Sequence, residues 1–219
     1  MRLKPIDYRI MQEQRSKTLG FTLLELMITI TIAAILVGIA VPNFMSVIQS
    51  NRLTTSANAF VTAMNLARSE AIKRGQIVVV REIGSDWKNG WQVFVDIDRA
   101  SPSSDADTYQ AGANSTLCES GEDCLLREFP ALPTSYTLDG SGNVSNYLSF
   151  MPAGDANTQG SFVICDNSDN NNLPEAGSSR LIVVNATGRL RIAEDSDNPK
   201  DGIPNTGSAG PNLTTCLPP

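Results

Sequence analysis

Residues 20–25 read Gly20-Phe21-Thr22-Leu23-Leu24-Glu25 and open an apolar run that continues to Val41. The run from Phe21 to Val41 is twenty-one residues long, and Glu25 is its only ionisable side chain. A helix of this length crosses a hydrocarbon core of about 30 Å. The sequence therefore predicts a transmembrane helix over residues 21–41.

The segment before this helix is basic. Positions 1–20 carry Arg2, Lys4, Arg9, Arg15 and Lys17 against Asp7 and Glu13. Positive flanks stay in the cytoplasm, so we expect a single-pass protein with a cytoplasmic N-terminus and an exported domain after Pro42. Met11 lies nine residues before Gly20 and is an alternative start, in which case residues 1–10 are untranslated and the topology is unchanged.

A carboxylate within a membrane span is energetically unfavourable, so the position of Glu25 requires an explanation. A plain anchor or a secretory signal peptide is the alternative interpretation, but a signal peptide has a shorter apolar region, and no small-residue cleavage site follows Val41. A carboxylate in a span marks a functional position. If the chain were cut after Gly20, the α-amine of Phe21 would lie one helical turn from Glu25. That pair, within one chain or between neighbours, would offset the desolvation of the carboxylate.

The segment resembles the processing site of type IV prepilins and type II secretion pseudopilins. In that family a membrane peptidase cuts after the glycine and methylates the new N-terminus, which implies a leader of residues 1–20 and processing at Gly20 and Phe21. The resemblance further implies an inner-membrane protein whose partners are the prepilin peptidase and other pilins or pseudopilins. Glu25 and Pro42, a frequent proline position in the family, would serve assembly into a filament or pilus tip. A pilus and a type II secretion system both remain open as the host machine.

Composition limits the other functions. The formal charge is −6, and without residues 1–20 twelve basic and twenty-one acidic residues would remain, a charge of −9. Any contact with nucleic acid therefore has to be local. Histidine is absent, which excludes His-based catalytic triads and His metal sites. We predict no enzyme, no cofactor and no metal.

The helical period continues beyond Pro42 and becomes amphipathic. Apolar residues recur at spacings of three and four from Phe44 to Ile72, with Lys73 and Arg74 in the last turn and Gly75 at a C′ position. We expect Pro42 to kink this helix without ending it. Residues 42–75 are thus predicted to be the second half of one long helix that packs under a sheet.

Eight strand-like runs follow within residues 76–219. They are rich in Val, Ile, Phe and Tyr and cover residues 76–82, 91–97, 125–129, 135–138, 147–151, 161–165, 180–184 and 188–192. Asn89-Gly90 and Asn185-Ala186-Thr187-Gly188 are typical of hairpin turns. Consecutive strands without helices between them predict an α+β fold in which one antiparallel sheet packs on the helix. Three polar stretches, 100–114, 166–179 and 194–215, predict mobile loops and a loose C-terminal tail.

Four cysteines follow the membrane span, where an oxidising compartment permits disulfides: Cys118, Cys124, Cys165 and Cys216. Three pairings are possible. Local closure favours Cys118–Cys124, which leaves Cys165–Cys216 to tie back the tail. Neither pair has the spacing of a redox or zinc motif, so we interpret both as structural.

From Gly20 to about Ile192 the chain resembles the GspH/FimT branch of the pilin superfamily. The residues that carry this likeness are 66–74, 87–96, 150–154 and 185–191. Gly188-Arg189-Leu190-Arg191 also resembles the DNA-contact loop of minor pilins for DNA uptake. On a strand Arg189 and Arg191 project to one face, where they can hold phosphates while Gly188 admits the DNA backbone. The alternative is an exposed arginine pair that neutralises the acids after it, Glu194, Asp195 or Asp197.

Two other features have alternative interpretations. The acidic runs 166–170 and 195–202 offer oxygen ligands to calcium, but neither has the full loop pattern, which favours solvated loops. Trp87 and Trp91 could anchor a carbohydrate or a protein, or cover the core beside the turn.

Overall fold

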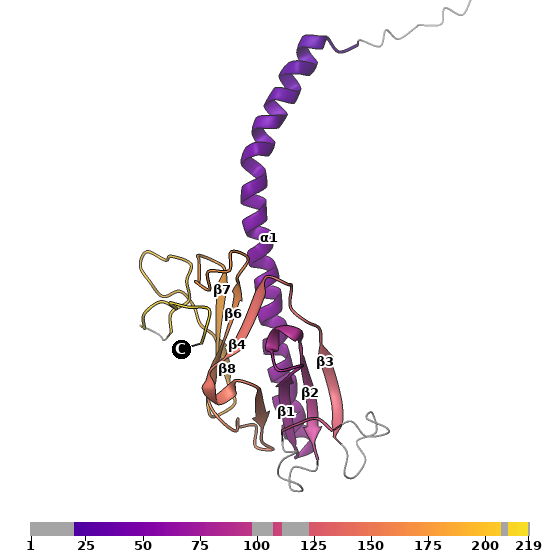
Figure 1. Cartoon of the computed structure of the whole chain (residues 1–219), viewed down its shortest axis with the longest axis vertical. Coiled ribbons are helices and arrows are strands. Elements are labelled where there is room, and N and C mark those ends of the chain that lie inside the picture. The colour runs from indigo at the N-terminus through magenta and orange to yellow at the C-terminus, as the bar shows by residue number, and fades with distance from the viewer. Residues whose placement is uncertain (1–19, 98–106, 111–122, 207–209, 219) are drawn as a thin grey trace, which may run out of the picture. The chain divides into compact units, whose positions relative to one another are not determined.

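The computed structural model describes residues 20–97, 107–110, 123–206 and 210–218 of the chain (Figure 1). The chain divides into two compact units, one reaching Phe44 and one starting at Met45. Helix α1, Leu23–Arg74, contributes to both units. It continues through Pro42 and ends where the sequence predicted, because Gly75 adopts a left-handed conformation (φ +65°) and donates its N–H to the carbonyl of Ala71 at 2.9 Å.

All eight predicted strands form, each within two residues of the expected bounds. They are β1 (Ile77–Glu82), β2 (Trp91–Asp96), β3 (Cys124–Phe129), β4 (Tyr136–Gly140), β5 (Tyr147–Phe150), β6 (Gly160–Asp166), β7 (Ser179–Val184) and β8 (Leu190–Ile192). Their pairings are antiparallel, so the α+β fold class is confirmed. Two short 3₁₀ helices interrupt the connections, η1 (Trp87–Asn89) and η2 (Gly142–Val144).

The prediction of a single sheet is wrong. The strands form two four-stranded sheets with the orders β3-β2-β1-β5 and β4-β6-β7-β8 (Figure 1). The chain leaves the first sheet after β3, starts the second with β4, returns to pair β5 with β1, and then completes the second sheet. The pairing of β1 with β5 is a long-range contact, and no turn motif in the sequence predicts it.

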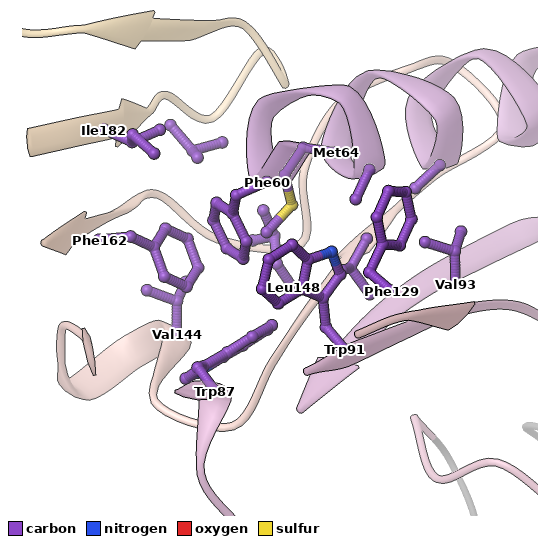
Figure 2. Packing of buried hydrophobic residues seen from close by; sticks show 14 of the residues in the cluster. Phe60, Met64, Trp87, Trp91, Val93, Phe129, Val144, Leu148, Phe162 and Ile182 are labelled. Atoms are coloured by element: carbon purple, nitrogen blue, oxygen red, sulfur yellow. The ribbon is translucent and has the colours of Figure 1, made fainter. Parts of the chain in front are cut away.

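One apolar core joins the second half of α1 to both sheets. The helix contributes a fully buried stripe, Leu53, Ala57, Phe60, Ala63, Met64, Ala67 and Ala71. Phe60 packs edge-on against Trp87, Trp91 and Phe162, with ring centroids 4.8–5.5 Å apart (Figure 2). Both tryptophans are therefore core residues. The alternative interpretation, in which they anchor a carbohydrate or a protein at the surface, is wrong.

The turn before β2 differs from the predicted hairpin. Residues 83–90 connect β1 to β2, and Asn89-Gly90 ends the 3₁₀ helix η1 instead of forming a two-residue turn. Asp86 caps η1 by accepting the N–H of Lys88 at 2.9 Å. The Nε1 of Trp87 donates to the carbonyl of Ser145 at 2.6 Å, which directs the indole into the core. Burial of Trp87 thus outweighs the local preference of Asn-Gly for a tight turn.

The expectation of a loose C-terminal tail is also wrong for the tail residues that the structure describes. The outer face of the second sheet is buried by tail side chains, with Ala193, Leu213 and Cys216 packed on Val163, Cys165 and Leu181. A disulfide joins Cys165 to Cys216, with 5.8 Å between their Cα atoms. Asn205, only 1% exposed, donates to Asp197, Gly210 and Asn212 and accepts from Ser196. The apolar contacts, the disulfide and the hydrogen bonds of Asn205 therefore order this polar C-terminal segment. The other expected pairing involves Cys118, which lies outside the described residues.

Candidate functional site

The start of α1 is shaped by Thr22. Its hydroxyl accepts the N–H of Glu25 at 3.1 Å, and its carbonyl accepts the N–H of Leu26 at 3.1 Å. This is the N-cap interaction, which satisfies a main-chain donor that has no partner within the helix. The sequence analysis did not assign this role to Thr22, although the Thr-x-x-Glu spacing that ends at Glu25 is the signature of a capping box. The helix therefore begins two residues after the Gly20–Phe21 junction.

The first unit exposes an apolar helical surface. Residues Leu23–Val41 are long and apolar enough to cross a membrane, and none of that segment is buried. Phe21 is 81% exposed, and Leu, Ile, Met and Val side chains follow at 51–77% on every side of the helix up to Val41. The hydroxyls of Thr29 and Thr31 donate to carbonyls of their own helix at 2.8 and 2.7 Å, so they place no unsatisfied donor on this surface. Exposing an apolar surface of this size to water is unfavourable, so lipid or other apolar helices have to cover it.

Arg189 and Arg191 lie on the β7–β8 hairpin, whose predicted turn is confirmed. The N–H of Gly188 donates to the carbonyl of Asn185 at 2.9 Å and closes the turn. Leu190 and Ile192 are half-buried against the core, so the alternation along the strand turns both arginines to the outer face, where they are exposed. Among the described residues neither arginine forms an ion pair with the acidic side chains that follow.

Gly188 has a packing role. It is buried with φ +71°, and a Cβ placed there would lie 2.2 Å from the carbonyl oxygen of Gly154 and 3.1 Å from Nε of Arg68. The sequence suggested that this glycine admits a ligand backbone, but the structure places the β5–β6 loop against it. A glycine is required here because both the left-handed conformation and the close approach exclude a side chain.

Arg68 is a residue that the sequence analysis did not single out. From α1 its Nε donates to the carbonyl of Gly154 at 2.8 Å, and its Nη2 donates to the carbonyl of Thr187 at 3.3 Å. It thereby joins the helix to the β5–β6 loop and to the turn that carries the arginine pair. Nothing in the local pattern marks this role, since the three segments are far apart in sequence.

A shallow groove lies beside the arginine pair on the outer face of the second sheet. It encloses about 370 Å³ between strands β6–β7 and the tail. Val183 and Asn185 belong to its lining; they lie across the ladder from Arg191 and Arg189. The polar side chains of the lining are neutral amides and hydroxyls, namely Ser141, Asn143, Gln159, Ser161, Asn185 and Thr206.

Arg180, on β7, does not share the exposed face of Arg189 and Arg191. It points toward α1, where Nη2 donates to the hydroxyls of Ser50 and Thr54 at 3.2 and 3.1 Å. Its burial lowers the pKa of the guanidinium below its ordinary value. Lys200 is exposed in the tail.

The acidic tail brings the carboxylates of Asp195, Asp197 and Asp201 within 4.8 Å of one another. Asp195 accepts the N–H groups of Gly202 and Asp197 at 2.6 and 3.0 Å. These main-chain donors, that of Gly202 foremost, hold the pKa of Asp195 below its ordinary value. The loop's own hydrogen bonds thus hold this carboxylate in place within the cluster.

Comparison with protein families gives two matches. The model of the family described as type II transport protein GspH matches residues 56–188, which is more than half of the chain. The model of the prokaryotic N-terminal methylation motif matches residues 15–41, the segment that contains Gly20, Phe21 and Glu25. No curated protein matches the chain.

Solved structures with a similar fold include the type IV minor pilin FimU of Pseudomonas aeruginosa. It is 18% identical, with a TM-score of 0.47, and the match covers 67% of this chain and 92% of FimU. The minor pseudopilin EpsH from the type 2 secretion system of Vibrio cholerae is 16% identical, with a TM-score of 0.43, and the match covers 67% of this chain and 99% of EpsH.

Proposed function

This chain belongs to the GspH family of minor pilins and pseudopilins, and from that premise we propose that it is a structural subunit processed after Gly20 and assembled through α1. Residues 1–20 would be the leader, residues 21–41 the membrane or filament-core helix, and residues 42–75 the half that carries the domain of residues 76–219. Before assembly the N-terminus would face the cytoplasm and the domain would lie outside the inner membrane. Its partners would be the prepilin peptidase and other subunits of a pilus or secretion filament.

One observation carries this proposal: the segment Leu23–Val41 of α1 exposes apolar side chains on all sides and has a single carboxylate, Glu25, in the first turn of the helix. The bilayer covers these side chains before assembly, and the helices of neighbouring subunits would cover them afterwards. A cut after Gly20 creates an amine next to the helix N-terminus, where the helix dipole disfavours a positive charge. Glu25, in the chain itself or in a neighbour, would supply the counter-charge when that amine leaves water.

The first test is the state of the N-terminus. In cells with an active prepilin peptidase, mass spectrometry of the membrane-extracted protein should find Phe21 as the first residue, carrying one N-methyl group. Protein that retains residues 11–20 in those cells would refute the proposal.

The second test separates insertion from assembly. Glu25→Ala makes the span more apolar, so it should leave insertion and cleavage intact but reduce the subunit in sheared filaments at least tenfold, since the amine is left without a counter-charge. Thr31→Ala is the matched control, because it removes a polar group that is satisfied within its own helix. Glu25→Ala subunits at parental yield in the filaments would contradict the role of Glu25.

A second candidate function is DNA contact during natural transformation. It is favoured by Arg189 and Arg191, which are exposed, form no ion pair with any residue that the structure describes, and lie beside a neutral polar groove. Such binding would involve phosphates only, so it should be weak, indifferent to sequence and steeply dependent on salt. Changing both arginines to Gln should lower duplex affinity and reduce the slope of log affinity against log salt by about 1.8. Arg127→Gln, at an exposed arginine of β3, is the control. This function is excluded if the full chain binds no DNA at about 50 mM salt.

A further inference from the structure

The second sheet ends in an edge at β8. The strand order β4-β6-β7-β8 leaves β8 with one neighbour, β7, among the strands of the described residues. The edge strand is only three residues long, Leu190–Ile192, and it follows directly on the turn that Arg68 and Gly188 hold in place. Edge strands offer main-chain groups to an added strand unless something covers them.

The direction of these main-chain groups follows from the hydrogen bonds to β7. Asn185 donates to the carbonyl of Arg189 at 3.1 Å, and Ala193 donates to the carbonyl of Leu181 at 2.7 Å. Hydrogen-bonded and non-hydrogen-bonded pairs alternate along an antiparallel ladder. Arg191, midway between those two pairs, therefore also bonds toward β7.

Leu190 and Ile192 alternate with these hydrogen-bonded residues, so their main-chain groups have the opposite direction. The N–H and C=O groups of Leu190 and Ile192 point away from β7, toward the edge. Their side chains are half-buried against the core, and those of Arg189 and Arg191 stand exposed on the outer face. The edge thus presents two main-chain donors and two acceptors, an apolar inner side and a doubly positive outer side.

We propose that this edge receives an extended acidic segment of a neighbouring filament subunit as an additional strand. The segment would carry Asp or Glu at two positions two residues apart, facing Arg189 and Arg191, with an apolar residue between them that extends the inner face. Opposite charges on neighbouring strands stabilise such a pair. Since the added strand belongs to another subunit, this inference rests on the proposed assembly function.

Alternating donors and acceptors select for a peptide over a nucleic acid. A peptide strand satisfies all four main-chain groups of Leu190 and Ile192, whereas phosphate oxygens accept hydrogen bonds only and would face the two carbonyls unfavourably. The brevity of β8 implies weak binding in free solution. Neighbours held in a filament have effective concentrations in the millimolar range, at which weak strand addition is sufficient.

Amide hydrogen exchange of the full chain tests the strand addition directly. The amides of Leu190 and Ile192 should exchange at least tenfold more slowly in sheared filaments than in the detergent-dispersed chain. The amide of Arg191, bonded toward β7, is the internal control and should be protected in both. Equal exchange of Leu190 and Ile192 in filaments that contain the chain would overturn the proposal.

Zero-length carbodiimide coupling tests the charges and identifies the partner. Arg189→Lys and Arg191→Lys keep the positive charge and supply the primary amine that this reagent joins to carboxylates. We expect cross-links from positions 189 and 191 to Asp or Glu of another subunit in filaments, and none from Arg127→Lys, the control on β3. Arg189→Gln with Arg191→Gln should lower the amount of subunit in filaments about tenfold, as expected for two exposed ion pairs.

The outcomes separate this inference from the proposed function. If the chain is in filaments but positions 189 and 191 couple only within their own chain, strand addition is refuted and the assembly function stands. If the chain never enters filaments, the assembly function fails and the inference fails with it. If the double Gln variant loses DNA binding while filament yield and exchange are unchanged, the arginines serve nucleic acid and the inference is overturned.

Discussion

Replacing Gly188 by Ala tests whether this glycine serves packing or a ligand. Two effects are expected to destabilise the variant. The left-handed conformation at φ +71° costs a residue with a Cβ about 1–2 kcal/mol. The new Cβ would also lie 2.2 Å from the carbonyl oxygen of Gly154, so the β5–β6 loop has to move away from Arg68.

That movement weakens the hydrogen bond from Arg68 to Gly154, which is 2.8 Å long and part-buried. Losing a hydrogen bond of a charged donor costs about 1.5–3 kcal/mol. Together the two effects lower the free energy of unfolding by about 2.5–5 kcal/mol. Gly142→Ala is the matched control, because no atom lies within 4 Å of its Cβ and its φ is not positive. We expect that control to change stability by less than about 0.5 kcal/mol.

Urea unfolding of the full chain in detergent, followed by tryptophan fluorescence, measures this difference. The two tryptophans of the chain, Trp87 and Trp91, are 2% and 1% exposed, so their emission reports on the core of the second unit. Arg68→Met combined with Gly188→Ala should cost less than the sum of the single changes, because both act on the same contact. If Gly188→Ala unfolds at the parental urea concentration but loses DNA binding, the packing explanation is refuted and the glycine serves a ligand.

Three further predictions concern the stability of the second unit. Changing Cys165 and Cys216 together to Ala removes a cross-link with a sequence separation of 51, which should lower the free energy of unfolding by about 4 kcal/mol and expose the tail to proteolysis; a loss under about 1 kcal/mol in denaturant titration would contradict this. Phe60→Ala removes a fully buried ring that contacts both tryptophans, and calorimetry should show a loss of about 3–5 kcal/mol. Burial, assisted by the nearby Asp86, raises the pKa of Asp139 above its ordinary value. Its ionised form is therefore disfavoured in the folded state, so Asp139→Asn should stabilise the protein at pH 7, and this gain should vanish as the pH falls below the unfolded-state pKa of Asp, about 3.9. A gain that persists at pH 3 would show that charge is not the cause.

Much of the secondary structure could be predicted from local residue patterns. The strands appear at the expected places because β-branched and aromatic runs bounded by Gly, Asn and Pro encode extended segments locally. The end of α1 at Gly75 and the turn from Asn185 to Gly188 follow from conformations that those residues adopt readily. The failures lie where long-range packing opposed a local preference, as at Asn89-Gly90, where burial of Trp87 produced a 3₁₀ helix.

The candidate sites divide in the same way. Glu25 and the Gly20–Phe21 junction could be found from sequence, because a lone carboxylate in an apolar run is conspicuous without any tertiary contact. The roles of Arg68, Arg180 and Gly188 could not, since each depends on groups from distant segments. Arg180 and Arg191 look alike in sequence, yet one bonds to hydroxyls of α1 and the other is exposed.

By itself the sequence determined the membrane-length helix, the segment that matches the N-terminal methylation motif, the identity of the eight strands and the family to which the chain belongs. These properties reside in contiguous residues, whose hydrophobicity and conformational preferences act over a few positions along the chain. Only the tertiary structure decided that the strands divide into two sheets, that the tail covers the outer face of one of them, and that β8 is an edge with two outward arginines. Those properties depend on which distant segments pack together. The arrangement that forms is the one that buries the apolar stripe of α1 and the outer face of β6–β7 at the same time.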